Sequence, residues 1–169
     1  MPRRTARGSI GRVRVRRLGD DEWRAARDVR LDTLATSPPG TFAQTFAEAS
    51  QWDERRWRQW YATRTMFVVE SEQRGIGCAG VLFEPTGPLL VSVWVSPAAR
   101  GTGASDLLLD SIVDWVRARG HHHLRLWVLD GNTPAEKLYR RMGFLPTGRQ
   151  QVTSAHSPDL ENEMVRVLR

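Results

Sequence analysis

The clearest chemistry in this sequence lies in a basic, glycine-rich turn at residues 97–105, PAARGTGAS. An apolar run at 89–95 precedes the turn and an amphipathic run at 106–119 follows it, so it joins an expected strand to an expected helix. The first N–H groups of a helix have no acceptor within the helix, and the helix dipole makes that end positive. Gly101 and Gly103 let the backbone curl and approach a ligand closely. The stretch therefore predicts a site for a pyrophosphate group.

The spacing within the turn distinguishes between known kinds of phosphate-binding motif. There is no Lys for the motif G-x-x-x-x-G-K-S/T, and Asp106 stands where G-x-G-x-x-G requires its last glycine. The order Q/R-x-x-G-x-G/A after a strand and a proline resembles the coenzyme A loop of the GNAT superfamily of N-acetyltransferases. Arg100 and Gly103 match it, while Ser105 stands where the family usually has Gly or Ala, and its hydroxyl could reach a phosphate or crowd it. A glycine-rich turn without a ligand is the alternative for this stretch alone.

A second signature lies at residues 132–144, NTPAEKLYRRMGF. The corresponding signature of the GNAT superfamily reads N-x-x-A-x-x-L-Y-x-x-x-G-F, and every fixed position is met here. Both signatures occur in the family's order, with an expected strand between them. The resemblance covers about residues 66–150, and the flanking segments agree with the family by general layout.

The resemblance implies direct transfer of an acetyl group from acetyl-CoA, the co-substrate, to a primary amine. Relatives use main-chain groups at the end of the strand before the turn to hold the pantetheine arm and the thioester carbonyl. Tyr139 matches the residue that, in many relatives, protonates the departing thiolate. The residues that the resemblance assigns to cofactor binding are Val93, Trp94, Val95, Arg100, Gly101, Thr102, Gly103, Ala104, Ser105 and Asn132.

Other interpretations of these residues stay open. Tyr139 belongs to an apolar stripe with Ala135, Leu138 and Met142, so its ring also fits a core position. Asn132 could cap the turn after Asp130 and Gly131. The strand that contains Val93 to Val95 could simply be buried, which does not conflict with cofactor contacts made by its backbone.

No general base stands where the resemblance implies one. Some relatives carry Glu on the strand before the turn, and residues 89–95 contain no carboxylate. Others carry Glu five residues before the Asn, where this chain has Trp127, and a bulky Trp there argues against the peptide-accepting relatives. A chain of water molecules could take the proton, the amine could arrive neutral, or Glu48, Glu84 or Asp130 could serve.

The elements that would position these residues can be read from periodicity and turn signals. The fold class expected is α/β (α+β), with a GNAT-type mixed, mostly antiparallel sheet that is flanked by helices and splayed around coenzyme A. The strand at 123–129 should run parallel to the strand at 89–95. The other expected strands are 13–18, 66–71, 76–83 and 163–168, and residues 147–158 are expected to form a loop. The expected helices are 20–35, 51–63, 106–119 and 133–142. Ser50 and Asp53 are expected to cap the second of these helices, and a capping box of Thr133 and Glu136 the last.

Aromatic residues gather on the expected helix at 51–63, where Trp57, Trp60 and Tyr61 share one face. Core packing explains this stripe, and the resemblance implies that this part of the chain borders the acceptor pocket. Phe42, Phe46 or Trp60 could then touch substrate. The tract at 121–123, HHH, is expected to form an exposed turn and not a metal site, because three successive residues cannot all face one ion.

Composition suggests a cytoplasmic protein of bacterial origin. Its 169 residues suit one domain, expected at 13–169 after a disordered basic arm at 1–12, and its single Cys78 excludes an internal disulfide. No run is long and apolar enough for a membrane span or a signal peptide, so no membrane partner is expected. The net charge of +6 is carried by Arg except for one Lys, a bias typical of GC-rich coding.

The function expected from these features is acetyl-CoA-dependent N-acetylation of a primary amine on a small molecule. The alternatives are a protein or peptide N-acetyltransferase, and a non-catalytic domain of the same fold that binds acyl-CoA or nucleic acid. A nucleic-acid partner is not favoured, because no aromatic interleaving or groove-reading motif accompanies the basic arm. A metal is not expected, and a homodimer stays open.

Overall fold

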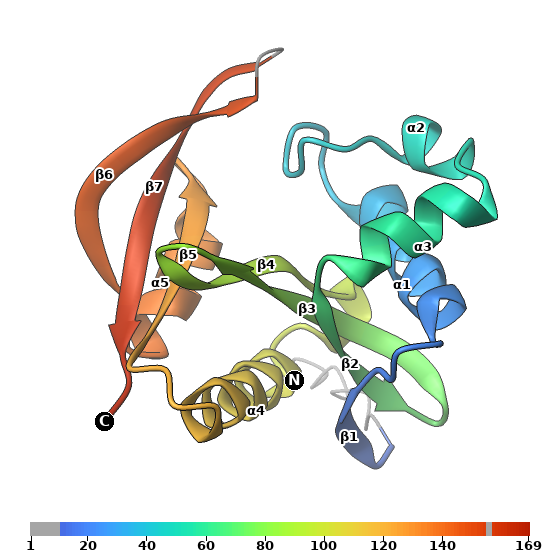
Figure 1. The fold of residues 1–169 in the computed structure, drawn as a ribbon, viewed down its shortest axis with the longest axis horizontal. Coiled ribbons are helices and arrows are strands. Elements are labelled where there is room, and N and C mark those ends of the chain that lie inside the picture. The colour runs from blue at the N-terminus through green and yellow to red at the C-terminus, as the bar shows by residue number, and fades with distance from the viewer. Residues whose placement is uncertain (1–10, 155–156) are drawn as a thin grey trace, which may run out of the picture.

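The computed structural model describes residues 11–154 and 157–169, which form a seven-stranded sheet flanked by helices (Figure 1). The strand order is β1-β2-β3-β4-β5-β7-β6, and only β4 and β5 pair in parallel. This confirms the predicted mixed, mostly antiparallel sheet. The strands are β1 Val13–Arg17, β2 Thr65–Ser71, β3 Arg74–Glu84, β4 Gly87–Val95, β5 His123–Leu129, β6 Leu145–Ser154 and β7 Ser157–Val167.

Helices cover both faces of the sheet, because successive residues of its inner strands are buried on opposite sides. Met66 and Val68 of β2 pack into one core with α1 and α3, while Phe67 and Val69 pack into the other core with α4 and α5. This alternation is the two-residue period of a strand buried on both faces. The helices are α1 Trp23–Thr36, α2 Phe46–Ser50, α3 Glu54–Ala62, α4 Ala104–Ala118 and α5 Thr133–Arg141, with a short 3-10 turn, η1, at Pro97–Ala99.

The sheet opens between its two central strands. The parallel pairing of β4 with β5 is confined to Leu89 with Arg125 and Leu90 with Leu126. Beyond Leu90, the pairing of β4 with β3 shifts register at Ser92, whose φ of +57° is unusual for a residue with a side chain. Such a bulge bends and twists a strand. The predicted splay is confirmed, and it leaves one backbone edge of each strand unpaired within the sheet.

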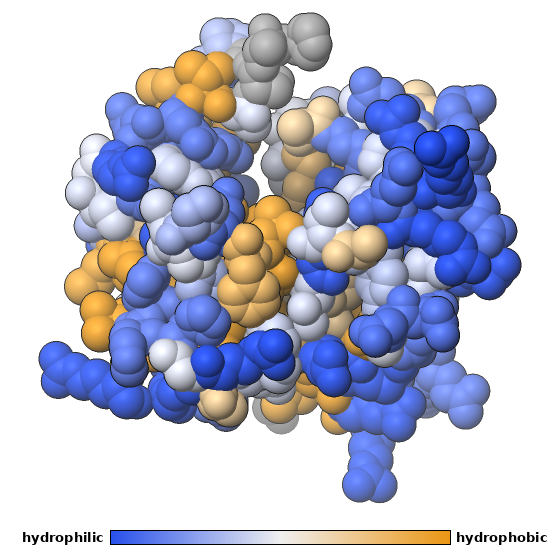
Figure 2. Space-filling view, viewed as in Figure 1, coloured by the Kyte–Doolittle hydropathy of each residue, from blue (hydrophilic) through white to orange (hydrophobic). Residues whose placement is uncertain are grey.

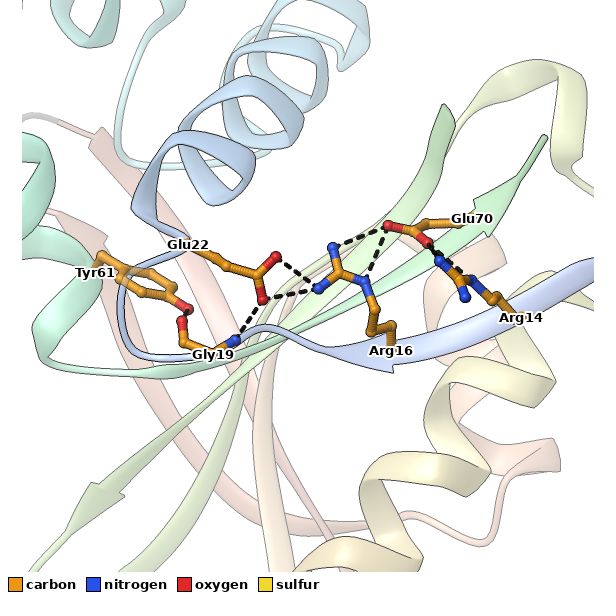
Figure 3. Close-up of polar contacts among 6 residues, drawn as sticks. All are labelled: Arg14, Arg16, Gly19, Glu22, Tyr61 and Glu70. Atoms are coloured by element: carbon orange, nitrogen blue, oxygen red, sulfur yellow. Dashed lines mark hydrogen bonds and ion pairs between the residues drawn. The ribbon is translucent and has the colours of Figure 1, made fainter. Parts of the chain in front are cut away.

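Polar contacts beside β1 and β2, at one edge of the sheet, hold the two helices that border this opening, α1 and α3. Figure 3 shows Arg16 of β1 between the carboxylates of Glu22, just before α1, and Glu70 of β2, at donor–acceptor distances of 2.7 to 3.2 Å. Glu22 also accepts the N–H of Gly19, and the Tyr61 hydroxyl of α3 donates to the Gly19 carbonyl. The network therefore joins the start of α1 and the end of α3 to β1 and β2.

Arg125 joins the two halves of the sheet where they still meet. Its guanidinium donates to Glu163 of β7 and to Glu84 of β3, each over 2.8 Å, and it contacts the hydroxyl of Thr86. Glu163 is only 2% exposed, and its second carboxylate oxygen accepts the Thr147 hydroxyl over 2.7 Å. Burial alone would raise the pKa of Glu163, but the hydrogen bonds from Thr147 and Arg125 hold that pKa below its usual range.

Replacing Glu163 with Gln should destabilise the fold by about 3 kcal/mol at neutral pH, because it leaves the Arg125 charge buried without its main partner. The pKa of Glu163 is lower in the folded protein than in the unfolded one, so its carboxylate stabilises the fold at pH values above the ordinary carboxyl pKa. This stabilisation is lost as the pH falls below that value. The matched control is Glu136→Gln, which breaks an exposed ion pair with Arg140 and should cost under about 1 kcal/mol. Denaturant melts of both variants at neutral and acid pH measure these losses. Equal losses of stability in the two variants would contradict the stabilising role of Glu163.

The expectation of a loop at 147–158 was wrong, because residues 147–154 belong to β6 and residues 157–158 to β7, and the two strands pair as a long β6–β7 hairpin. The hairpin projects beyond the rest of the sheet (Figure 1), and polar residues dominate its sequence at 147–151 and 157–163, so the sequence there lacks the alternating pattern that reveals a half-buried strand. Cross-strand pairs hold it, including Gln150 with Asn162 at 2.8 Å and Gln151 with Glu161 at 3.0 Å. The expected last strand at 163–168 is the end of β7.

Helix boundaries differ from the expected ones in two further places. The expected helix at 51–63 is α3, which begins only at Glu54 and is capped by Asp53. Ser50, also expected as its cap, is instead the last residue of a separate short helix, α2, which starts with a capping box of Thr45 and Glu48. The helix after β5 is capped by Asn132 and not by the expected Thr133, since Asn132 accepts the N–H of Ala135 over 3.3 Å. Residues 1–10, most of the expected basic arm, lie outside the described residues, so the arm stays a prediction.

Candidate active site

A cavity of about 1050 Å³ lies where β4 and β5 separate. Its floor is formed by both strands, one side by α5 and the β6–β7 hairpin, and the other by α1, α3 and the loop between α1 and α2. In Figure 2 the surface is hollowed between these two sides, and apolar side chains gather near the centre of the view. The lining includes Val93 and Asn132 among the expected cofactor-binding residues and the expected catalytic residue Tyr139.

The glycine-rich turn has the backbone that an anion site requires. Gly103 is the N-cap of α4 with a left-handed φ of +88°, and no side chain caps the first turn of this helix. A Cβ at Gly103 or Gly101 would meet no atom within 4 Å. Both positions therefore combine a positive φ, which favours glycine, with open space beside the backbone. The N–H groups of the first turn of α4, at Ala104, Ser105 and Asp106, therefore have no side-chain cap.

The polar side chains of this turn are engaged locally. The Thr102 hydroxyl donates to the carbonyl of Ala99, and the Ser105 hydroxyl lies 3.4 Å from the Asp106 carboxylate, which also pairs with Arg141. Arg100 is exposed, and its Nε donates weakly to the Val95 carbonyl over 3.4 Å. The guanidinium of Arg100 thus stays at the surface beside the helix end, where a phosphate could meet it.

The end of β4 reaches the cavity at Val93, while Trp94 and Val95 lie outside its lining. Val93 lines the cavity, whereas the ring of Trp94 points into the opposite core and donates to the Thr36 hydroxyl over 3.1 Å. Cys78 is buried behind this strand, and its thiol donates to the Ser92 carbonyl over 3.5 Å. Burial raises the pKa of Cys78 to about 11, so this thiol is neutral at physiological pH.

Tyr139 belongs to the core and also lines the cavity. Its ring is packed in the core, edge-on to Phe144 at a centroid distance of 5.9 Å, and it also lines the cavity. Within the part of the chain that the structure describes, its hydroxyl has no hydrogen-bond partner. Burial raises the pKa of the Tyr139 phenol well above its usual value, so this hydroxyl keeps its proton at neutral pH.

The three candidate bases differ in position. Glu84 is paired with Arg125 and Asp130 accepts from Asn162 over 3.0 Å, and neither lines the cavity. Glu48 does line it, with one carboxylate oxygen accepting the N–H of Thr45. Glu161 also lines the cavity, and sequence reasoning missed it because residues 159–162 were assigned to no element.

Aromatic and cationic side chains form the wall opposite Tyr139. Trp60 and Phe42 line the cavity, as considered from the sequence, but Phe46 is 46% exposed and lies outside it. Trp127 lines the cavity floor. Sequence reasoning missed Arg30, Gln44 and Arg64, which also line this wall, because nothing in their local spacing marks them.

The histidine tract lies at the start of β5. His123 begins β5, and its Nε2 lies 3.0 Å from the Thr86 carbonyl oxygen. Across residues 11–154 and 157–169, no cluster of His, Cys, Asp and Glu side chains is arranged to hold a metal ion. Among the same residues, no helix is both long enough and apolar enough to cross a membrane.

Comparison with known proteins bears on both the fold and the site. The family model described as "Acetyltransferase (GNAT) family" matches residues 27–144, which include both signatures and most of the cavity wall. A structure of the yncA protein from Salmonella typhimurium with its cofactor acetyl-CoA has a TM-score of 0.72 over 94% of this chain and 95% of that one. At 19% identity, this likeness shows a shared fold.

Two relatives are similar in sequence over part of their length. The mycothiol acetyltransferase of Beutenbergia cavernae is 28% identical over 176 residues, covering 82% of this chain and 58% of the relative. The streptothricin acetyltransferase of Streptomyces lavendulae is 36% identical over 84 residues, covering 48% of this chain and 44% of the relative. The chain thus spans about half the length of the relatives that it matches.

Proposed function

This chain belongs to the acetyltransferase (GNAT) family, and from that premise we propose that it transfers an acetyl group from acetyl-CoA to a primary amine of a small molecule. The observation that carries the proposal is one cavity that combines the open backbone edge of β4 with the protonated hydroxyl of Tyr139. The uncapped start of α4 follows β4 directly in the chain. The acceptor amine and the thioester would meet between the separated strands.

The chain's own residues fit the parts of coenzyme A. The diphosphate would accept N–H groups from the first turn of α4, where Gly103 leaves the approach open and the helix dipole favours an anion. Arg100 would add a charge-assisted contact at the surface. The pantetheine arm would run along the unpaired edge of β4 beside Val93, and Asn132 would contact it where it passes the start of α5.

The reaction needs charge stabilisation and two proton movements. The amine nitrogen attacks the thioester carbonyl, and a backbone N–H of β4 would stabilise the oxyanion, a contribution of about 3 kcal/mol for one well-placed donor. The carbon–sulfur bond then breaks, and Tyr139 would donate its proton to the departing thiolate. The proton lost by the amine would pass to a cavity carboxylate, Glu48 or Glu161, directly or through water.

A small-molecule acceptor is favoured by the shape of the cavity and by the relatives. Its volume is in the range of small-molecule sites, and aromatic side chains form much of its wall. Trp127 occupies the position where peptide-accepting relatives carry Glu. The two relatives are named for mycothiol and streptothricin, which are small molecules. We further propose a bacterial, cytoplasmic protein, supported by the bacterial relatives and the single free thiol of Cys78.

A panel of primary amines, assayed by thiol release from acetyl-CoA, tests this function. We expect release with at least one amine, together with a product heavier by one acetyl group, and no release with tertiary amines, which have no N–H to replace. A protein that binds coenzyme A but acetylates only peptides would favour the protein-acetylating alternative. Binding of coenzyme A with no acceptor of any kind would favour the non-catalytic alternative.

A further inference from the structure

Arg30 places a buried cation on the wall of the cavity without an ion-pair partner. This residue of α1 is 6% exposed, and its Nε donates to the side-chain oxygen of Gln44 over 3.0 Å. Its Nη1 has no hydrogen-bond partner within the described residues, and no carboxylate there pairs with it. Burial lowers the pKa of Arg30, which reflects a charge that the protein does not compensate. Buried charges in proteins are normally paired or bound to a ligand.

The surroundings of Arg30 restrict where a partner could bind. Its guanidinium carbon lies 4.8 Å from the ring centroid of Phe42 and 5.8 Å from that of Trp60. Aromatic rings pack on the flat faces of a guanidinium, whereas its N–H bonds lie in its plane and point outward from its edge. The free N–H groups of Arg30 are therefore not covered by these rings. The side-chain nitrogen of Gln44 is buried and also has no partner within the described residues. Two neighbouring groups therefore hold unused hydrogen-bond donors.

Arg64 adds a second cation to the same wall. Its Nε donates to the Trp60 carbonyl over 2.9 Å, and its guanidinium carbon lies 4.1 Å from the Trp60 ring centroid. Burial and then the charge of Arg30 lower the pKa of Arg64 to about 10. Two nearby cations without an anion between them are a costly arrangement that a bound anion would relieve.

The carboxylates that line the cavity are engaged with other groups. Glu48 accepts the N–H of Thr45, Asp53 caps α3, and Glu161 accepts from Gln151. The cofactor's phosphates are also unsuited to Arg30, because the turn proposed to hold them does not belong to the cavity lining. Arg30 and Gln44 both line the cavity, so their side chains border the space left for the acceptor.

We propose that Arg30 and Gln44, with the charge of Arg64 beside them, bind a carboxylate of the acceptor, so that the substrate is a primary amine that also carries a carboxylate. A planar guanidinium edge matches the two oxygens of a carboxylate in a bidentate pair. This inference rests on the proposed acetyl transfer and specifies its substrate class. Arg30 would bind the carboxylate while the amine lies toward β4 and Tyr139 in the same cavity.

The test compares amines that differ only in the carboxylate: a set of amino acids, their carboxamides and their decarboxylated counterparts, assayed by thiol release from acetyl-CoA. We expect kcat/KM for the acids to exceed that for both counterparts about a hundredfold, the effect of a buried charge pair. Arg30→Met should reduce this ratio to within about tenfold, mainly through a higher KM for the acids. Arg27→Met is the matched control, since Arg27 lies on the same helix, pairs with Asp28 and is outside the cavity lining; its ratio should stay unchanged.

Equal kcat/KM for acids and carboxamides, or an unchanged ratio in folded Arg30→Met, would overturn the inference while leaving acetyl transfer to amines in place. Absence of turnover with every amine would instead overturn the proposed function and this inference with it. If melting shows that Arg30→Met does not fold, Gln44→Leu in the loop between α1 and α2 serves instead. That variant should lower the preference for acids about tenfold, and an unchanged preference would contradict the role of this pair.

Discussion

Replacing Gly103 with Trp is expected to abolish coenzyme A binding while the protein still folds. The left-handed φ of +88° at this position disfavours any residue with a Cβ, by about 1 to 2 kcal/mol. No atom lies within 4 Å of the new Cβ, so the indole would extend over the start of α4 and not into the core. It would then occupy the space where the phosphates must approach the backbone. Calorimetric titration with coenzyme A measures the loss directly.

Gly120→Trp provides a matched control at the opposite end of α4. Gly120 has a similar φ of +83° and equally open surroundings, so it carries the same backbone strain without facing the proposed phosphate site. Both variants should melt at similarly lowered temperatures, and only Gly103→Trp should lose the cofactor. Unchanged affinity in folded Gly103→Trp would remove the phosphate-binding role of this turn.

Replacing Tyr139 with Phe is expected to reduce turnover on the order of a hundredfold, the contribution of general acid catalysis. The ring would keep its place against Phe144, and the lost hydroxyl has no partner within the described residues. Stability and coenzyme A affinity should therefore change little. Since burial raises the pKa of Tyr139, wild-type activity should not decline through deprotonation of this group until pH exceeds the ordinary tyrosine value of about 10.

The other tyrosine of the chain gives a control with the opposite result. Tyr61 donates to the Gly19 carbonyl and lies outside the cavity lining, so Tyr61→Phe should lose about 1 kcal/mol of stability and retain turnover. The measurements are kcat with an accepted amine and a denaturant melt for each protein. Equal turnover in Tyr139→Phe and wild type would leave a water molecule as the proton donor.

The strand–turn–helix unit around Gly103 could be predicted because its determinants are local. Glycine at a left-handed position, a preceding proline and an amphipathic helix lie within about twenty consecutive residues, and each acts through the backbone next to it. The same holds for α5, where the cap, the apolar stripe and the terminal glycine are contiguous. Even there the expected cap, Thr133, was wrong, and Asn132 is the N-cap of the helix.

The sequence by itself determined most of the elements around the site and the two signatures, and with them the family, but not α2 or β6. The tertiary structure alone decided which side chains share the cavity. Arg30 and Gln44 meet because α1 and the following loop fold back on each other, and Glu161 reaches the cavity because the polar β6–β7 hairpin extends beside it. Contacts between residues far apart in the chain leave no periodic mark on the sequence, since they depend on how separate elements pack and not on the preferences of any one of them.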